Sequence, residues 1–210
     1  MVDYQMVNES TEPTKASPSH AEPHNGSGFA VPSANWYIAE CKPTRERTIR
    51  TMLQKAHYEA YVASRVETHI YKSRNKRQVE KVVIPSKVFI RTEQDNLIKI
   101  LYEYSSIYRF MLNKAVASDK NGIRPFAFVP DDQMQQLQYV LGNASNPVFL
   151  TADELKLNQK VRVMRGPLAG LEGYFLKKAH ASYIVVKIEM GTRHYVYTEI
   201  DIEDIQTIDR

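Results

Sequence analysis

The side chains best suited to catalysis or metal binding are few and scattered in this 210-residue chain. Two histidines, His20 and His24, lie in an N-terminal stretch where a metal site is possible, although solvated side chains explain them more simply. The others lack the spacing of metal ligands; they are His57, His69, His180 and His194. No serine stands in the setting of a hydrolase nucleophile, and no glycine loop has phosphate-binding spacing. The sequence therefore predicts no catalytic residue, no metal site and no cofactor.

Other reactive groups also have simpler explanations. Asp131 and Asp132 follow Pro130 at the start of a helical pattern, where acidic residues favour the helix dipole. Cys41 is the single cysteine, which excludes an internal disulfide and a cysteine-based zinc site. The N-terminus lacks the features of a secretory signal, and no apolar run approaches the ~20 residues that cross a bilayer. We expect a cytoplasmic protein with no membrane partner.

Charge is distributed unevenly along the chain. Residues 1–34 carry four acidic and one basic side chain, and residues 143–154 carry two acidic ones. Residues 35–142 carry 18 basic and 11 acidic side chains, whereas residues 155–210 carry nine and seven. The basic central segment is compatible with nucleic-acid binding, although an ordinary solvated surface gives the same balance.

Composition and periodicity predict four parts. Residues 1–34 are rich in Pro, Ser and Glu and cannot bury enough apolar surface to fold, so we expect a disordered tail. Residues 35–142 mix strand and helix patterns, which predicts an α+β domain with a mainly antiparallel sheet. Residues 143–154 lack periodicity and are expected to be a linker. Residues 155–210 contain only short strand patterns and predict a small closed β-barrel.

Within the α+β part, Asn35–Cys41 is expected to be a strand and the next helix to begin after Thr44 as its N-cap. Ile49, Leu53 and Ala56 form the apolar stripe of that helix. Two β-rich runs flank residues 73–77, which predicts a long hairpin with a basic tip. Two more helices are expected. One is capped by Asp95, and the other ends at Gly142 with Met134, Leu137 and Leu141 facing inward.

Three glycines interrupt two strand patterns in "VRVMRGPLAGLEGYFLKK", Val161–Lys178. Gly166 and Gly170 bracket a tight turn that needs relaxed φ angles, and Gly173 restarts a strand where two backbones approach closely. A plain hairpin turn in a small barrel accounts for this pattern. The same spacing also resembles a KOW motif, which occurs in ribosomal proteins as well as transcription factors.

The combination of stretches is more specific than any one of them. "NWYIAECKP", "VVIPSKVFIRT", "FAFVPDDQMQQL" and the KOW-like segment occur in that order, and residues 35–210 thereby resemble the NusG family of transcription elongation factors. The stretch "LNKAVASDKNGIRPFAFVPDDQMQQLQYVLGN" is most similar to UpxY-type antiterminators of Bacteroidetes, paralogues associated with capsular polysaccharide operons. The resemblance implies an N-terminal NGN domain, folded as an α/β sandwich, and a C-terminal KOW barrel.

The resemblance further implies that an apolar patch of the NGN domain binds the clamp helices of RNA polymerase. The matching residues are Trp36, Val83, Ile84, Pro85, Val88, Phe89 and Phe110. Because alternate residues of a strand face inward, about half of this set suits a core equally well. The Ile84–Pro85 step is expected to be the exposed part.

Specialised paralogues such as RfaH also contact the non-template DNA strand, and the matching surface begins at "CKPTRERTIR". The residues implied in nucleic-acid contact are Lys42, Arg45, Arg47 and Arg50, together with Arg74, Lys76 and Arg77 at the hairpin tip. A solvated helix face, with Glu46 and Arg50 as an i,i+4 ion pair, explains the helix residues as an alternative. The threonine-rich motif through which RfaH contacts the polymerase gate loop has no counterpart in "DNLIKILYEY".

We therefore expect a monomeric, non-enzymatic antitermination factor whose partners are RNA polymerase and the non-template strand or nascent leader RNA. Three alternatives remain open. A housekeeping NusG-type factor would couple polymerase to Rho or to a ribosomal protein through the KOW domain. The others are a ribosome-associated or RNA-binding KOW protein and a nucleic-acid enzyme.

Overall fold

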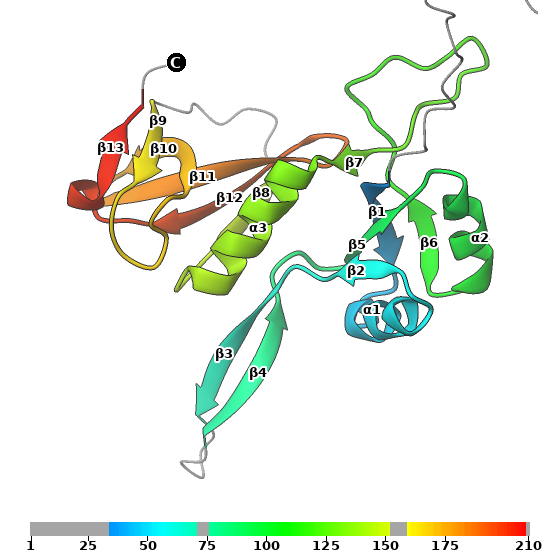
Figure 1. Cartoon of the computed structure of the whole chain (residues 1–210), viewed down its shortest axis with the longest axis horizontal. Coiled ribbons are helices and arrows are strands. Elements are labelled where there is room, and N and C mark those ends of the chain that lie inside the picture. Colours follow the sequence, from blue (N-terminus) through cyan, green and yellow to red (C-terminus); the bar gives the residue numbers. More distant parts are fainter. Residues whose placement is uncertain (1–33, 71–75, 152–158, 209–210) are drawn as a thin grey trace, which may run out of the picture. The chain divides into compact units, whose positions relative to one another are not determined.

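The computed structural model describes residues 34–70, 76–151 and 159–208 (Figure 1). The N-terminal elements are β1 (Asn35–Cys41), α1 (Glu46–Lys55), β2 (Glu59–Tyr61), β3 (Ser64–Ile70), β4 (Lys76–Val82), β5 (Lys87–Thr92), α2 (Asn96–Glu103), β6 (Ile107–Phe110), β7 (Phe128–Val129) and α3 (Asp131–Asn143). The later elements are β8 (Val148–Thr151), β9 (Lys160–Val163), β10 (Glu172–Lys178), β11 (Ala181–Glu189), β12 (Arg193–Glu199), the short 3₁₀ helix Ile202–Asp204 and β13 (Ile205–Thr207).

The first sheet is built around β1. Its strand order is β2-β5-β1-β6, β7 also pairs with β1, and every pairing is antiparallel. The aromatic and β-branched run "NWYIAEC" favours this extended conformation. Its side chains alternate between two apolar clusters, because Trp36 and Ile38 belong to one and Tyr37, Ala39 and Cys41 to the other. The sheet is therefore buried on both faces.

Helices cover the two faces of this sheet. Ile49 of α1 and Leu97 of α2 are buried in the cluster of Tyr37, whereas Met134 and Leu137 of α3 are buried in the cluster of Trp36. The predicted α+β class, with mainly antiparallel strands and few helices, is confirmed. With 13 residues, α3 is the longest helix of the described part, in which no helix has the length and apolarity to cross a membrane.

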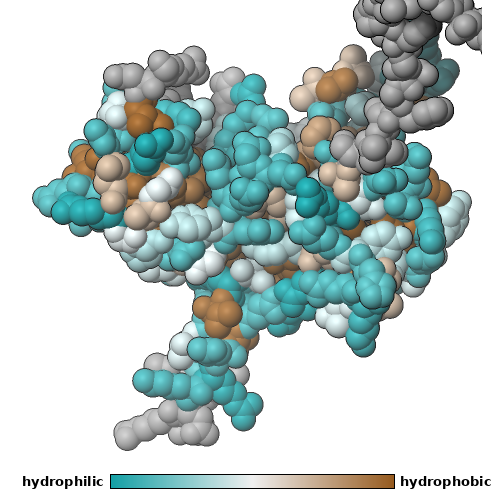
Figure 2. Space-filling model, in the orientation of Figure 1, coloured by the Kyte–Doolittle hydropathy of each residue, from teal (hydrophilic) through white to brown (hydrophobic). Residues whose placement is uncertain are grey.

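Strands β3 and β4 form a separate two-stranded hairpin, paired from Ser64 opposite Val82 to Ile70 opposite Lys76. Its stem agrees with the predicted hairpin, while residues 73–75 of the predicted tip, residues 73–77, lie outside the described residues. Figure 2 shows apolar side chains on this otherwise hydrophilic hairpin, where Val66 and Val79 are exposed. Val82, the last residue of β4, packs against the cluster of Tyr37, and no other described residue of the hairpin belongs to either apolar cluster.

The C-terminal strands form a sheet in the order β13-β9-β10-β11-β12-β8. A closed barrel was expected, but among the described residues no pairing joins the two end strands β13 and β8. One end strand comes from the predicted linker, because β8 lies within residues 143–154 and pairs with β12. An all-β segment after α3 is thus observed, without the predicted closure.

The C-terminal sheet contacts α3 and the chain that precedes it. Val163, Ile184 and Val186 join the same apolar cluster as Leu137. The Tyr139 hydroxyl donates to the carbonyl oxygen of Ala169 at 2.9 Å. Two further hydrogen bonds run from the Glu189 N–H to Gln133 Oε1 at 2.8 Å and from the Lys114 N–H to the Gly191 oxygen at 2.9 Å. The buried residues of α3 therefore belong to one apolar cluster that both sheets share, and polar contacts join the C-terminal sheet to the helix and to the chain before it.

Three local predictions about helices are wrong. Thr44 is not an N-cap: it has φ +67°, and α1 begins after Arg45 without a side-chain cap. Ala56 follows α1 and is exposed, so the buried stripe ends at Leu53. Gly142 does not end α3, which continues to Asn143. Each error lies at a helix end, where helix bounds vary by one or two residues.

The predicted backbone roles of the three glycines are confirmed. Gly166 and Gly170 have φ of +84° and +88°, in the left-handed region that favours glycine. At Gly173 an added Cβ would lie 2.7 Å from the Val185 oxygen and 2.8 Å from Ile184 Cγ1. Gly173 is thus required by the close approach of β10 and β11.

Replacing Gly173 with alanine should lower the free energy of unfolding by roughly 1–3 kcal/mol, because the new methyl group overlaps backbone atoms of β11. The matched control is Gly142→Ala, since an added Cβ there meets nothing within 4 Å. Alanine inside α3 should stabilise by about 0.5–1 kcal/mol. Urea titration followed by circular dichroism measures both, and a Gly173→Ala protein as stable as the parent contradicts the close approach.

Candidate nucleic-acid interface

The turn between β1 and α1 presents two of the predicted nucleic-acid residues. The Lys42 N–H donates to the Ser106 oxygen at 2.9 Å, and the Arg45 N–H donates to the Lys42 oxygen at 3.1 Å. Glu46, only 4% exposed, accepts a hydrogen bond from the Ser86 N–H at 2.7 Å. These three hydrogen bonds therefore hold the backbone of the turn in place.

Lys42 and Arg45 are both exposed at this turn. Within the described residues, neither side chain makes an ion pair or a side-chain hydrogen bond. Two cations on a fixed backbone, without carboxylate partners, are available for phosphate groups. The structure thus places these two predicted residues together at the surface.

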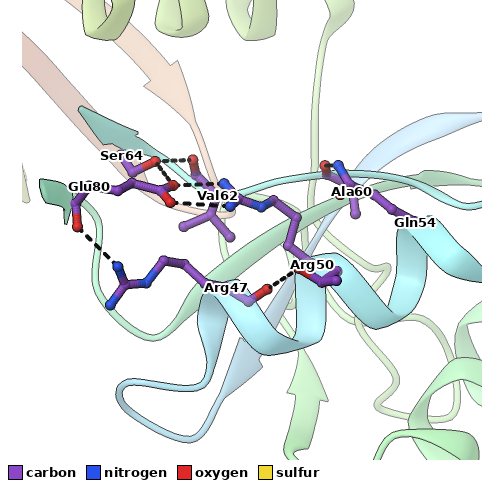
Figure 3. Close-up of polar contacts among 8 residues, drawn as sticks. Arg47, Arg50, Gln54, Ala60, Val62, Ser64 and Glu80 are labelled. Carbon is purple, nitrogen blue, oxygen red and sulfur yellow. Dashed lines mark hydrogen bonds and ion pairs between the residues drawn. The ribbon is translucent and has the colours of Figure 1, made fainter. Parts of the chain in front are cut away.

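Arg47 and Arg50, one turn further along α1, are engaged by the hairpin instead (Figure 3). Arg50 forms two hydrogen bonds to the Glu80 carboxylate, at 2.7 and 3.2 Å, and the Ser64 hydroxyl donates to the same carboxylate at 2.5 Å. Arg47 donates to the Glu80 backbone oxygen at 3.2 Å. The predicted Glu46–Arg50 pair is wrong, because each partner finds a better-fixed group on another element.

The electrostatics of this contact favour an ionised Glu80. The hydrogen bond from Arg50 lowers the pKa of the Glu80 carboxyl most, burial opposes this, and the Ser64 hydroxyl adds to the lowering. The Arg50 and Glu80 side chains are 25% and 28% exposed, so solvent screens the pair only in part. Because the bidentate pair joins α1 to the base of the hairpin, we assign Arg50 a positioning role.

The basic residues of the hairpin lie away from this junction. Lys76 and Arg77 are exposed at the start of β4, opposite Ile70 and His69, whereas Arg74 lies outside the described residues. Four residues of extended strand, about 13 Å, separate Lys76 from Glu80. The predicted cations therefore do not form one continuous cluster.

The apolar residues matched to the clamp-binding patch are mostly buried. Trp36, Ile84 and Phe89 belong to the cluster that includes α3, whereas Val88 and Phe110 belong to the cluster beneath α1 and α2. Val83 is partly exposed and Pro85 is exposed, so the set does not form one surface.

The expected exposure of Ile84 is wrong, because this side chain is 1% exposed. The N–H groups of Val83 and Ile84 both donate to the Ala63 oxygen, at 2.8 and 3.3 Å. These two bonds draw the segment against the sheet and bury Ile84 beside Phe89 in the same cluster.

Sequence reasoning missed the carboxylates that organise these cations. Glu80, the carboxylate that binds Arg50, lies 30 residues beyond it in the chain, and Ser64, whose hydroxyl binds Glu80, lies 14 residues beyond it. No local spacing therefore indicates the contact between Arg50 and Glu80. A similar cluster joins Glu40 to Lys87 at 2.9 Å and to Arg109 at 2.5 Å. Burial raises the pKa of Glu40, but the hydrogen bonds from these two cations outweigh it and the pKa is lowered.

The residues suited to redox or metal chemistry are not assembled into a site. Among the described residues, no group of three or more His, Cys, Asp or Glu side chains has a metal-binding arrangement. Cys41 is buried, and burial raises the pKa of its thiol to about 11. At neutral pH this thiol is protonated and a poor nucleophile.

Comparison with known families decides the affiliation. Residues 34–138, which contain β1 through most of α3, match the family model NusG, described as "Transcription termination factor nusG". The chain belongs to the NusG family. Members of the NusG family are transcription elongation factors rather than enzymes, and they bind RNA polymerase, which agrees with the expected class.

Among solved structures, the NusG-family chain is similar to one in "Crystal Structure of MjSpt4:Spt5 complex conformation B", at 8% sequence identity. The match covers 83% of this chain and 97% of that chain, with a TM-score of 0.26. A TM-score of this size does not support a common arrangement of the two structures. A comparison with curated proteins finds no match.

Removing the Glu80 charge should loosen the hairpin. We expect Glu80→Gln to lower the free energy of unfolding at pH 7 by about 1–3 kcal/mol, because Arg50 loses a charged acceptor. The pKa of Glu80 is lowered in the folded state, so its contribution is complete above about pH 4.5 and is lost as pH falls through the lowered pKa.

The stability difference between Glu80→Gln and the parent should therefore shrink as pH falls below about 4.5, as measured by urea titration at each pH. Glu103→Gln is the control, because Glu103 faces Lys99 at 3.9 Å on an exposed helix surface. A difference that stays constant over this pH range would refute the role of the ionised carboxylate.

Proposed function

We propose that this chain is a specialised transcription elongation and antitermination factor that binds RNA polymerase and promotes processive transcription of long operons. The proposal rests on one observation above all, the NusG-family match over residues 34–138. The resemblance of residues 112–143 to UpxY-type factors favours capsular polysaccharide operons as targets.

The proposed division of labour follows the predicted domains. Residues 35–142 act as the NGN domain that binds polymerase, residues 143–154 connect, and residues 155–210 act as a KOW domain that recruits a further partner. The turn conformations of Gly166 and Gly170 and the close approach at Gly173 are compatible with a KOW module.

On the NGN domain, Lys42 and Arg45 are the proposed contacts to the non-template strand. Their exposure and their lack of carboxylate partners among the described residues support this role. Arg50 is removed from the proposed contacts because Glu80 holds it, and Arg47 contributes only in part. Lys76 and Arg77 are proposed as a second contact, to upstream DNA.

Polymerase binding is proposed to use the accessible part of the apolar patch. Val83 and Pro85 are the members of that set with exposed surface. The buried members, such as Ile84 and Phe89, support this surface from below.

Replacing Lys42 and Arg45 together with alanine should weaken binding to polymerase complexes that expose a non-template strand, and spare binding to polymerase without a bubble. Each lost single-strand phosphate contact should reduce the salt-dependence slope by roughly 0.7. Gel-shift titration at several salt concentrations measures both quantities. Lys55→Ala combined with Lys99→Ala removes the same charge elsewhere and is the control. Equal weakening of both complexes would assign the two residues to the protein interface.

Val83→Glu should reduce polymerase affinity at least tenfold while the protein stays folded, because it places a charge on the accessible part of the patch. Ile84→Glu should instead unfold the domain, since it buries an unpaired charge. Circular dichroism and polymerase pull-down separate the two effects. A folded Val83→Glu protein with unchanged affinity would remove this surface from the proposal.

The amount of full-length transcript made from a long template distinguishes the proposed antitermination role from a housekeeping role. An antitermination factor should increase full-length transcript in the presence of Rho, whereas a factor that recruits Rho should decrease it. An increase supports the proposal, and a decrease overturns it.

A further inference from the structure

The C-terminal sheet has two faces of different chemistry. One face carries Val163, Ile184 and Val186 and joins the apolar cluster that contains α3. On the other face, the strand register places Tyr174 opposite Val185, and Val185 opposite Tyr197. We call this second face the tyrosine face.

The tyrosine face has a small apolar centre of its own. Leu176, Val185 and Tyr195 are 9%, 0% and 3% exposed, and the partly buried rings of Tyr174, Tyr183 and Tyr197 pack against them. Tyr183 and Tyr197 meet edge to face, with ring centroids 5.4 Å apart and planes at 88°. The rings are therefore held in place by packing while part of their surface stays accessible.

Cations accompany these rings. Lys178 Nζ lies 4.8 Å from the centroid of the Tyr197 ring, within cation–π range. By strand alternation the same face carries five cationic side chains, Lys160, Arg162, Lys178, Lys187 and Arg193, and three carboxylates, Glu172, Glu189 and Glu199.

The carboxylates neutralise only part of this charge. Glu172 contacts Lys160 at 2.9 Å and Arg162 at 2.5 Å, and Glu189 contacts Lys187 at 2.5 Å. Within the described residues, Lys178 and Arg193 have no carboxylate partner. Glu199, opposite Tyr183, has no cationic partner among the described residues, so the five cations and three carboxylates leave this face of partly accessible rings with a net charge of +2.

We propose that the tyrosine face binds single-stranded nucleic acid, with bases stacking on Tyr174, Tyr183 and Tyr197 and with Lys178 and Arg193 contacting phosphates. Aromatic platforms bordered by cations bind unpaired bases with little sequence preference. Two strand spacings, about 10 Å, separate β10 from β12, which is room for two or three bases.

The alternatives fit this surface less well. The accessible aliphatic surface that a protein partner would use is limited here to Val148 and Leu150 on the edge strand β8, because Leu176 and Val185 are covered. A duplex keeps its bases stacked internally and offers none to the rings. The tyrosine face is also composed of residues different from Lys42 and Arg45, so this inference does not rest on the proposed function.

The test is fluorescence anisotropy of the full chain with labelled 12-nucleotide single strands of RNA and of DNA, and with the matching duplex. Lys178→Ala should weaken single-strand binding about fivefold or more. Lys177→Ala is the matched control, because Lys177 is the exposed neighbour on the same strand and points to the opposite face. It should change binding less than twofold.

Tyr183→Leu and Tyr197→Leu should each weaken single-strand binding about tenfold, whereas Tyr102→Leu, at a tyrosine that is 85% exposed on α2, should have no effect. Near-ultraviolet circular dichroism verifies folding. If a tyrosine variant does not fold, the comparison of Lys178→Ala with Lys177→Ala still decides.

Each further outcome has one meaning. Equal weakening by Lys177→Ala and Lys178→Ala, duplex binding as tight as single-strand binding, or no binding of either strand would overturn the proposal. The effect of Lys178→Ala should persist in a Lys42→Ala/Arg45→Ala background. This result would hold even if the proposed polymerase function failed, so the two proposals fail separately.

Discussion

Burial of β1 on both faces is the constraint on which the rest of the molecule depends. A strand whose alternate side chains enter two apolar clusters needs helices on either side, and α1 with α2 supplies one cover while α3 supplies the other. The apolar cluster that contains α3 also contains residues of the C-terminal sheet, so α3 positions that sheet as well. Lys42 directly follows the last residue of β1. The position of the candidate interface therefore depends on how this strand packs in the core.

The candidate interface shows how neighbouring cations acquire different roles. Arg50 is held by the Glu80 carboxylate and Arg47 by the Glu80 backbone, so both connect helix to hairpin. Lys42 and Arg45 precede the helix and have no carboxylate partner among the described residues. All four residues carry the same charge. Their roles differ because the fold brings an acidic residue into contact with the side chains of Arg47 and Arg50 but not, within the described part of the chain, with those of Lys42 and Arg45.

The sequence predicted features that depend on local chemistry. The bounds of β1 follow from its aromatic and β-branched run, the glycine turn from its need for positive φ, and the inward face of α3 from the period of Met134 and Leu137. The NusG family was also predicted from motif order, and the family match confirms it. What failed depends on distant partners: the Arg50–Glu80 contact, the burial of Ile84 under bonds to Ala63, and the recruitment of β8 by β12. These contacts join residues far apart in the chain, which no local pattern encodes.

The hairpin is attached to α1 close to one end, through the bonds of Glu80 to Arg50 and Arg47, while Lys76 lies about 13 Å along β4 from Glu80. The far end of the hairpin therefore extends from contacts at its base, which also include the hydrogen bond from Arg65 to the Ser145 oxygen at 2.9 Å. A rotation of about 5° at Glu80 would move Lys76, about 13 Å away, by about 1 Å, which is more than a hydrogen bond tolerates. The positions of the hairpin cations Lys76 and Arg77 therefore depend on the contact between Glu80 and Arg50, in which neither cation takes part.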